Sequence, residues 1–236
     1  MTGTRTVRLL LLLLSAVALY ATRSLVGGDG PPPAPEEAVT ARELAAPYAA
    51  LVADVADWWA GIYPQLSGGE VFAPLEGGFV GYAAQTGPTC GDELVGPERV
   101  VYCVGPDYIA WDRAFLGQIL TRYGQAAVGA VLAHEYGHAA QQRLFAAGVL
   151  PTPDASGLAR EEQSADCLAG AWFADYAERR GLRLSHRARV IALFRSGRDS
   201  RGEQIVEGSS LDQAEVFDLG HEQGPQRCLT LLRAQD

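Results

Sequence analysis

Two histidines and a glutamate with the spacing of a metal site occur in the segment His134-Glu135-Tyr136-Gly137-His138. The segment lies in an apolar stretch that we expect to be helical, and residues four apart share one face of a helix. His134 and His138 can therefore direct their imidazoles at one metal ion. In this H-E-x-x-H pattern two histidines hold zinc and the glutamate, here Glu135, activates a water molecule.

A third ligand is available in the next predicted helix, where Glu162 and Asp166 lie four residues apart and so share a face. Glu162 would complete a His2Glu zinc site with an open fourth position for water. Asp166, one turn further on, would accept the free ring N–H of a ligating histidine and fix its tautomer. Alternatively, Glu161 and Glu162 only complement the dipole at the start of a helix.

The two helices that carry these residues must lie side by side for the site to form. The motif helix should extend over about 125–147 and the ligand helix over about 158–180, joined by a short polar loop, 151–157. Short connections make antiparallel neighbours. The part of the motif helix after His138 is about 15 Å long, which leaves Glu162 within reach of that histidine.

The segment before the two helices has a different amino-acid composition. Residues 63–112 are dense in Gly and Pro and contain short β-prone runs, which predicts a small antiparallel sheet of short strands joined by turns. We therefore expect an α+β fold that is mainly helical, in a single domain over residues 39–236.

The N-terminal segment has the features of an export signal. Arg5 and Arg8 precede an apolar run that continues to Ala21, and this pattern predicts a signal peptide within residues 1–26. The alternative is an uncleaved membrane anchor formed by residues 7–22. Residues 27–38 are rich in Gly and Pro and predict an extended linker. In either case we expect an exported domain, secreted or held at the cell envelope.

Four cysteines fit such a compartment, and an even count in an exported chain suggests two disulfide bonds. Cys90 and Cys103 flank one turn-rich loop and are the expected first pair; closing that loop contributes about 3 kcal/mol in the chain-entropy model. Cys167 and Cys228 would then pair by elimination. The alternative for Cys167 is a buried, unpaired side chain.

The charge of the chain bears on its partners. The net charge is -9 at pH 7, and all the basic residues are arginines, with no run or face of them. A nucleic-acid partner is therefore not expected, because such partners need a basic patch. Nothing in the sequence predicts an oligomeric state.

The motif residues resemble those of the bacterial neutral zinc metallopeptidases, whose members carry H-E-x-G-H-x-x-Q followed by E-L-Q-A-D-C-x-A-G. The first motif is matched by residues 134–141, which end at Gln141, and the second by residues 162–170 except at Gln163 and Ser164. Weaker matches are Asp57-Trp58-Trp59, Cys90-Gly91, Tyr102-Cys103, and His221 with Gln226-Arg227. The resemblance implies a zincin-like fold and peptidase activity.

His221 is a further candidate. We expect it in a loop, where it could reach the cleft and stabilise a developing oxyanion; a solvent-exposed loop histidine is the alternative.

These features together predict a zinc metallopeptidase with one Zn²⁺ ion and a peptide or protein substrate. Glu135 would act as the general base, and an edge strand of the sheet could bind an extended peptide. Two alternatives remain open: a catalytically silent zincin-fold binding or scaffold protein of the cell envelope, and a structural zinc site, which usually has four protein ligands.

Overall fold

The computed structural model of the chain describes residues 48–83, 85–153, 157–196 and 212–233. These residues belong to one compact unit, Thr40–Asp236. They form seven helices: α3 (Ala49–Ser67), α4 (Arg113–Tyr123), α5 (Gln125–Ala146), α6 (Leu158–Arg180), α7 (Leu184–Phe194), α8 (Gln213–Gln223) and α9 (Pro225–Arg233). They also form five short strands: β1 (Gly78–Tyr82), β2 (Thr89–Cys90), β3 (Glu93–Leu94), β4 (Val100–Cys103) and β5 (Tyr108–Asp112). The predicted α+β class, mainly helical, is confirmed for the described residues.

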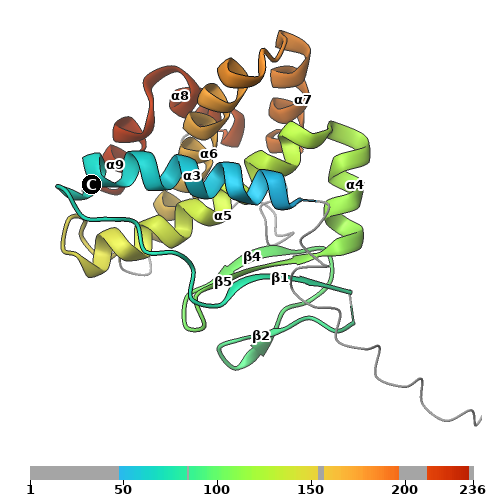
Figure 1. The fold of residues 1–236 in the computed structure, drawn as a ribbon, viewed down its shortest axis with the longest axis horizontal. Helices are drawn as coiled ribbons and strands as arrows, with labels where there is room; N and C mark the ends of the chain where they lie inside the picture. The colour runs from blue at the N-terminus through green and yellow to red at the C-terminus, as the bar shows by residue number, and fades with distance from the viewer. Residues whose placement is uncertain (1–47, 84, 154–156, 197–211, 234–236) are drawn as a thin grey trace, which may run out of the picture. The chain divides into compact units, whose positions relative to one another are not determined.

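Helix α5, which carries the histidine motif, is surrounded by other elements. It packs against α3, α4, α6, α7 and strand β4, and in Figure 1 the sheet lies on the opposite side of α5 from most of α6. Apolar residues occur on every face of α5, as expected for a buried helix. The motif is thus placed on one of the most enclosed helices of the domain.

Helices α5 and α6 run antiparallel, as predicted. Gly129 of α5 faces Trp172 of α6, and Gly137 faces Ala165, so the order of contacts along one helix is the reverse of that along the other. A Cβ atom on Gly129 would collide with the Trp172 ring, and one on Gly137 would lie 3.3 Å from Ala165 Cα. The two glycines therefore allow α6 to approach the motif closely, which offsets their lower helix propensity.

The sheet differs from the antiparallel sheet that the sequence predicts. Its strand order is β1-β5-β4, with β4 antiparallel and β1 parallel to β5, while β2 and β3 form a separate antiparallel pair. Strand β1 pairs with β5 rather than with a strand next to it in sequence. Alternation of apolar and polar residues reports which face of a strand is buried and not its direction, so the prediction of an all-antiparallel sheet was wrong.

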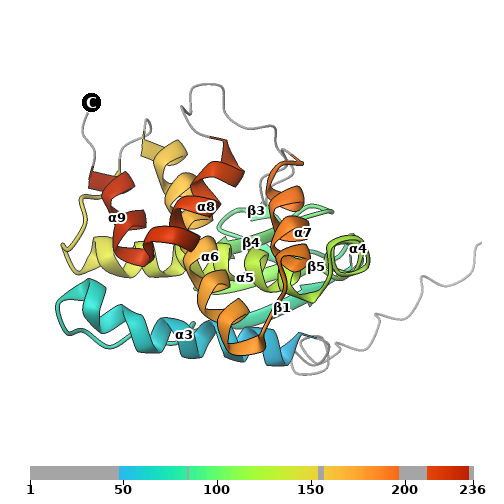
Figure 2. The ribbon, with the colours of Figure 1, turned by 90° about the horizontal axis from the view of Figure 1, so that it is seen from above.

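Helix α8 lies directly against α6. A Cβ atom on Gly170 of α6 would collide with the backbone of Phe217, and one on Gly220 of α8 would collide with the backbone of Cys167. Helix α9 packs beside α8 on the same helix, and Figure 2 shows this pair on the opposite side of α5 from α3. The ligand helix is therefore held between α5 and the α8–α9 pair.

Both predicted disulfide bonds are present. Cys90 of β2 is bonded to Cys103 of β4, across 13 residues of sequence, and Cys167 of α6 to Cys228 of α9, across 61. In the chain-entropy model loops of these sizes correspond to about 3 and about 4 kcal/mol. The alternative of an unpaired Cys167 is thereby excluded. Disulfide bonds of this kind are typical of an oxidising, extracytoplasmic compartment.

The predicted signal peptide or anchor, residues 1–26, and the predicted linker, residues 27–38, lie outside the described residues. Within the part of the chain that the structure describes, no helix is long and apolar enough to cross a membrane.

Candidate metal centre

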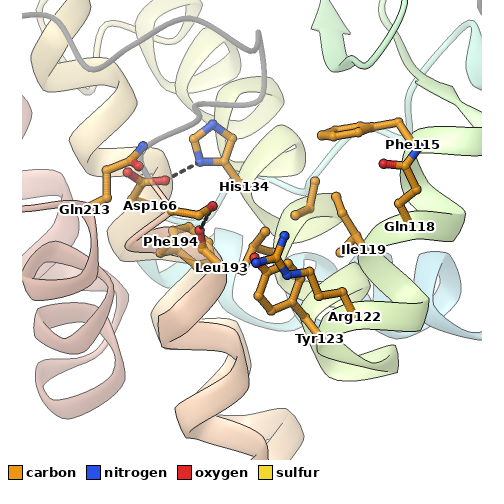
Figure 3. Close-up of a pocket in the computed structure, with 12 residues that line it drawn as sticks. Phe115, Gln118, Ile119, Arg122, Tyr123, His134, Asp166, Leu193, Phe194 and Gln213 are labelled. Carbon is orange, nitrogen blue, oxygen red and sulfur yellow. Dashed lines mark hydrogen bonds and ion pairs between the residues drawn. The ribbon is translucent and has the colours of Figure 1, made fainter.

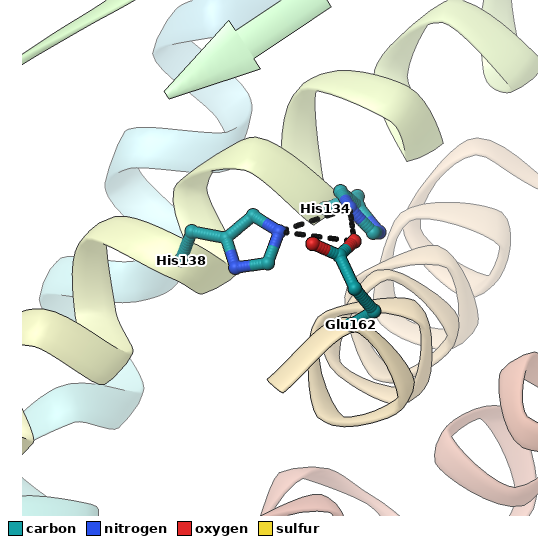
Figure 4. A group of neighbouring side chains, drawn as sticks. All are labelled: His134, His138 and Glu162. Carbon is teal, nitrogen blue, oxygen red and sulfur yellow. Dashed lines mark hydrogen bonds and ion pairs between the residues drawn. The ribbon is translucent and has the colours of Figure 1, made fainter. Parts of the chain in front are cut away.

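Three side chains from α5 and α6 converge on one point, as predicted (Figure 4). His134 Nε2 lies 3.1 Å from His138 Nε2, and Glu162 Oε2 lies 3.4 Å from the first nitrogen and 3.5 Å from the second. Ligand atoms about 2.0–2.1 Å from a tetrahedral zinc ion are about 3.3–3.4 Å apart. The three atoms thus have the spacing that a single tetrahedral ion requires, and the group could hold a metal ion.

The outer nitrogen of each histidine contacts a polar partner. His134 Nδ1 lies 2.7 Å from Asp166 Oδ1, and His138 Nδ1 lies 3.0 Å from Gln141 Oε1. A carboxylate and an amide oxygen are acceptors, so both histidines donate from Nδ1. In the neutral rings the Nε2 lone pairs then face each other, and a cation between them would relieve their repulsion. Asp166 thus lies beside His134, and its role in supporting a metal ligand stays a prediction.

Gln141 had no role of its own in the predicted site. Its side chain is fully buried; Oε1 accepts from His138, and Nε2 donates to the backbone oxygen of Glu161 at 2.9 Å. One residue thus supports a histidine of α5 and the backbone of α6 immediately before Glu162. The signal available in the sequence was its position three residues after His138, on the same helix face.

The electrostatic environment favours a positive charge at the point of convergence. Burial alone would lower the pKa of His134, but the carboxylates of Asp166 and Glu162 outweigh it and hold that pKa well above its usual value. The pKa of His138 is likewise raised against the effect of burial, mainly by Glu162. Burial would raise the pKa of Glu162, yet the two imidazoles hold it well below its usual range. The carboxylates around the two imidazoles thus favour a cation at this point.

Access to the cluster differs between its members. The His134 side chain is 5% exposed, whereas those of His138 and Glu162 are 15% and 21% exposed. The cluster is therefore more exposed at His138 and Glu162 than at His134. Three possible ligands converge there among the described residues, and catalytic zinc sites commonly have three protein ligands, whereas structural sites usually have four.

Glu135 lies between the cluster and the sheet. Its side chain is buried, and Oε2 accepts a hydrogen bond of 2.7 Å from the backbone N–H of Tyr102 in β4. Its negative charge contributes to the raised pKa values of both His134 and His138. Glu135 is thus close to both imidazoles, and its carboxylate is oriented by the backbone of the neighbouring strand.

The structure places His221 differently from the prediction. It lies within helix α8 and not in a loop, because the helix continues to Gln223. Its ring packs against Phe173 of α6, with centroids 5.9 Å apart. Burial and the nearby Arg187 guanidinium lower its pKa. Its described contacts are therefore with α6 and α7 and not with the three converging side chains, and its predicted role in catalysis stays a prediction.

A pocket borders the cluster. It has a volume of about 490 Å³ and is lined by His134 and Asp166 together with residues of α4 and α7, as Figure 3 shows. A ligand in this pocket would lie next to the candidate metal site.

Comparison of the chain with protein-family models, with curated proteins and with solved structures found no match. The resemblance to the bacterial neutral zinc metallopeptidases therefore rests on the motif residues, and the zincin-like fold remains a prediction.

Proposed function

We propose that the chain is a zinc-dependent hydrolase of peptide bonds that acts outside the cytoplasm. The observation that carries the proposal is the convergence of His134 Nε2, His138 Nε2 and Glu162 Oε2 within 3.5 Å of one another, with both histidine Nδ1 atoms on polar partners. Two imidazoles and one carboxylate form a donor set that suits zinc. The two disulfide bonds support the proposed location.

In this proposal the reaction is acid–base catalysis by Glu135. Zinc, when bound, supplies Lewis-acid polarisation of the scissile carbonyl and lowers the pKa of water. Glu135 accepts the proton of the attacking water and passes it to the leaving amine. The Tyr102 N–H holds one carboxylate oxygen at 2.7 Å, which restricts the rotation of Glu135. Asp166 and Gln141 keep the two imidazoles in one orientation.

The peptide is proposed to bind along β4. This strand is at the end of the order β1-β5-β4, so one of its edges faces away from β5. The Tyr102 N–H lies on that edge, because it bonds to Glu135 rather than to β5. An extended peptide that adds to the same edge would hydrogen-bond to strand backbone and pass close to Glu135.

Metal content and turnover of the full chain test the proposal. We expect the parent to hold one zinc ion per chain and the Glu162→Gln variant to hold less, with Glu161→Gln as the matched control on the neighbouring residue. We expect Glu135→Gln to retain zinc and to lose at least about 100-fold in the cleavage rate of a mixed peptide library followed by mass spectrometry.

Two outcomes would overturn parts of the proposal. If Glu135→Gln cleaves peptides as fast as the parent, Glu135 is not the general base. If the parent holds zinc but cleaves no peptide, the catalytically silent binding or scaffold protein is the better account.

A further inference from the structure

The pocket beside the cluster has mainly apolar walls. Its volume of about 490 Å³ is within the range of small-molecule sites, and exceeds that of a single side chain. The apolar lining comes from three helices: Phe115, Ile119 and Tyr123 of α4, Val131 of α5, and Leu193 and Phe194 of α7. Four of these side chains, at 115, 123, 131 and 193, are only partly buried. The pocket therefore suits a bulky apolar group.

An arginine lies in this apolar lining. Arg122 of α4 is exposed, and in Figure 3 its guanidinium extends toward Leu193. Its described contact is with the ring of Tyr123, 5.2 Å from the centroid. Among the described residues Arg122 has no ion pair, in contrast to Arg143 and Arg179, which bind aspartates. Among the described residues of the lining, the one carboxylate is that of Asp166, which is bonded to His134.

A second polar group of the lining lacks a hydrogen-bond donor among the described residues. Gln213, the first residue of α8, lines the pocket near Asp166. Its Oε1 atom is buried and accepts no hydrogen bond from the described residues. A buried acceptor without a donor is unfavourable, because its desolvation is not compensated. A bound ligand that offers an N–H group would remove this penalty.

We propose that the pocket is a substrate subsite that binds a bulky apolar residue followed by a carboxylate, with the carboxylate held by Arg122 and a ligand N–H by Gln213. This inference rests on the proposed function in one respect, that the ligand is a peptide. The carboxylate can be an acidic side chain or the C-terminus of the peptide, because both present the same group to a guanidinium. The chain would then prefer acidic or C-terminal segments over neutral internal ones.

Binding to the zinc-loaded full chain tests the inference without requiring cleavage. We would use the Glu135→Gln background and titrate four peptides by calorimetry. N-acetyl-Gly-Phe-Glu amide carries a side-chain carboxylate, and N-acetyl-Gly-Phe with a free C-terminus carries a terminal one. N-acetyl-Gly-Phe-Gln amide is the neutral control, and N-acetyl-Gly-Ala-Glu amide lacks the bulky group.

We expect one or both of the carboxylate peptides with Phe to bind about five- to tenfold more tightly than the neutral and Ala-containing peptides. Arg122→Gln should remove the advantage over the neutral peptide, while Arg227→Gln, which removes an equal charge from the exposed face of α9, should retain it. Which carboxylate peptide binds better identifies the source of the carboxylate.

The inference is wrong if the neutral peptide binds as tightly as both carboxylate peptides, or if Arg122→Gln keeps the preference. These outcomes differ from failure of the proposed function. If the parent chain shows the Arg122-dependent preference but hydrolyses no peptide, the proposed subsite is supported and the proposed hydrolase activity is contradicted. Thermal unfolding of each variant checks that the fold is intact.

Discussion

Replacement of Gln141 should weaken metal binding although its side chain is not one of the three candidate ligands. In Gln141→Leu both hydrogen bonds of the buried amide are lost, so His138 Nδ1 and the Glu161 carbonyl each lose their contact with residue 141. His138 is then free to change its tautomer or rotate, and the backbone before Glu162 is less constrained. Two of the three ligands are thus affected by one substitution.

The expected magnitudes follow from these contacts. Two buried hydrogen bonds contribute about 1 kcal/mol each, so the free energy of unfolding of the metal-free protein should fall by about 1–3 kcal/mol. Loss of the residue that supports a ligating histidine typically lowers metal affinity by about 10–100-fold. This loss corresponds to about 1.4–2.7 kcal/mol of binding free energy.

Two assays separate the effects. Zinc affinity is measured by competition with a chromogenic chelator, and stability by urea unfolding in the presence of a chelator. Gln141→Glu keeps an acceptor for His138 but loses the donor to the Glu161 carbonyl, so it should recover much of the affinity while remaining less stable. Gln142→Leu, on the next, partly exposed residue, is the control. The reasoning would be refuted if folded Gln141→Leu bound zinc as tightly as this control.

Two further predictions concern stability. Gly220→Ala should destabilise the fold by about 3 kcal/mol or more, because its Cβ would collide with the Cys167 backbone. Gly61→Ala in α3, where a Cβ would have no atom within 4 Å, should stabilise the fold by up to about 1 kcal/mol. Equal melting temperatures for the two variants would contradict this prediction. Burial raises the pKa of Asp54, but hydrogen bonds and charge from Arg179 outweigh burial and lower that pKa overall. The contribution of Asp54 to folding stability should therefore be present above about pH 4 and be lost as the pH falls through the lower folded-state pKa. Asp54→Asn should therefore reduce stability by about 1 kcal/mol at pH 7 and by less at pH 3, and a constant difference in melting temperature would exclude this ion pair as the cause.

The candidate metal site was predictable because its geometry is largely local. His134 and His138 share a helix face through the four-residue spacing, and Glu162 and Asp166 do so for the same reason. A short connection brings the second helix back along the first. One long-range relation, the antiparallel packing of α5 and α6, was then enough to bring all four side chains together.

The wrong or missing predictions concern features that depend on long-range pairing and packing rather than on the local sequence pattern. Strand direction in the sheet depends on which strands pair, and β1 pairs with β5 across an intervening hairpin. His221 was expected in a loop, but helix α8 includes it because the segment packs on α6 through Gly220. The pocket could not be predicted either, since its walls come from α4, α5, α6, α7 and the start of α8.

By itself the sequence determined the donor types and their spacing within each helix, the four cysteines and the helical character of the chain, because these depend on residue identity and helix period alone. The tertiary structure decided that three ligand atoms lie within 3.5 Å of one another, that Gln141 bonds to His138, and that Glu135 takes its hydrogen bond from β4. It also placed Arg122 in an apolar pocket beside His134. Those relations depend on how closely the helices and the strand approach one another, and that approach is set by the packing of side chains distant in sequence.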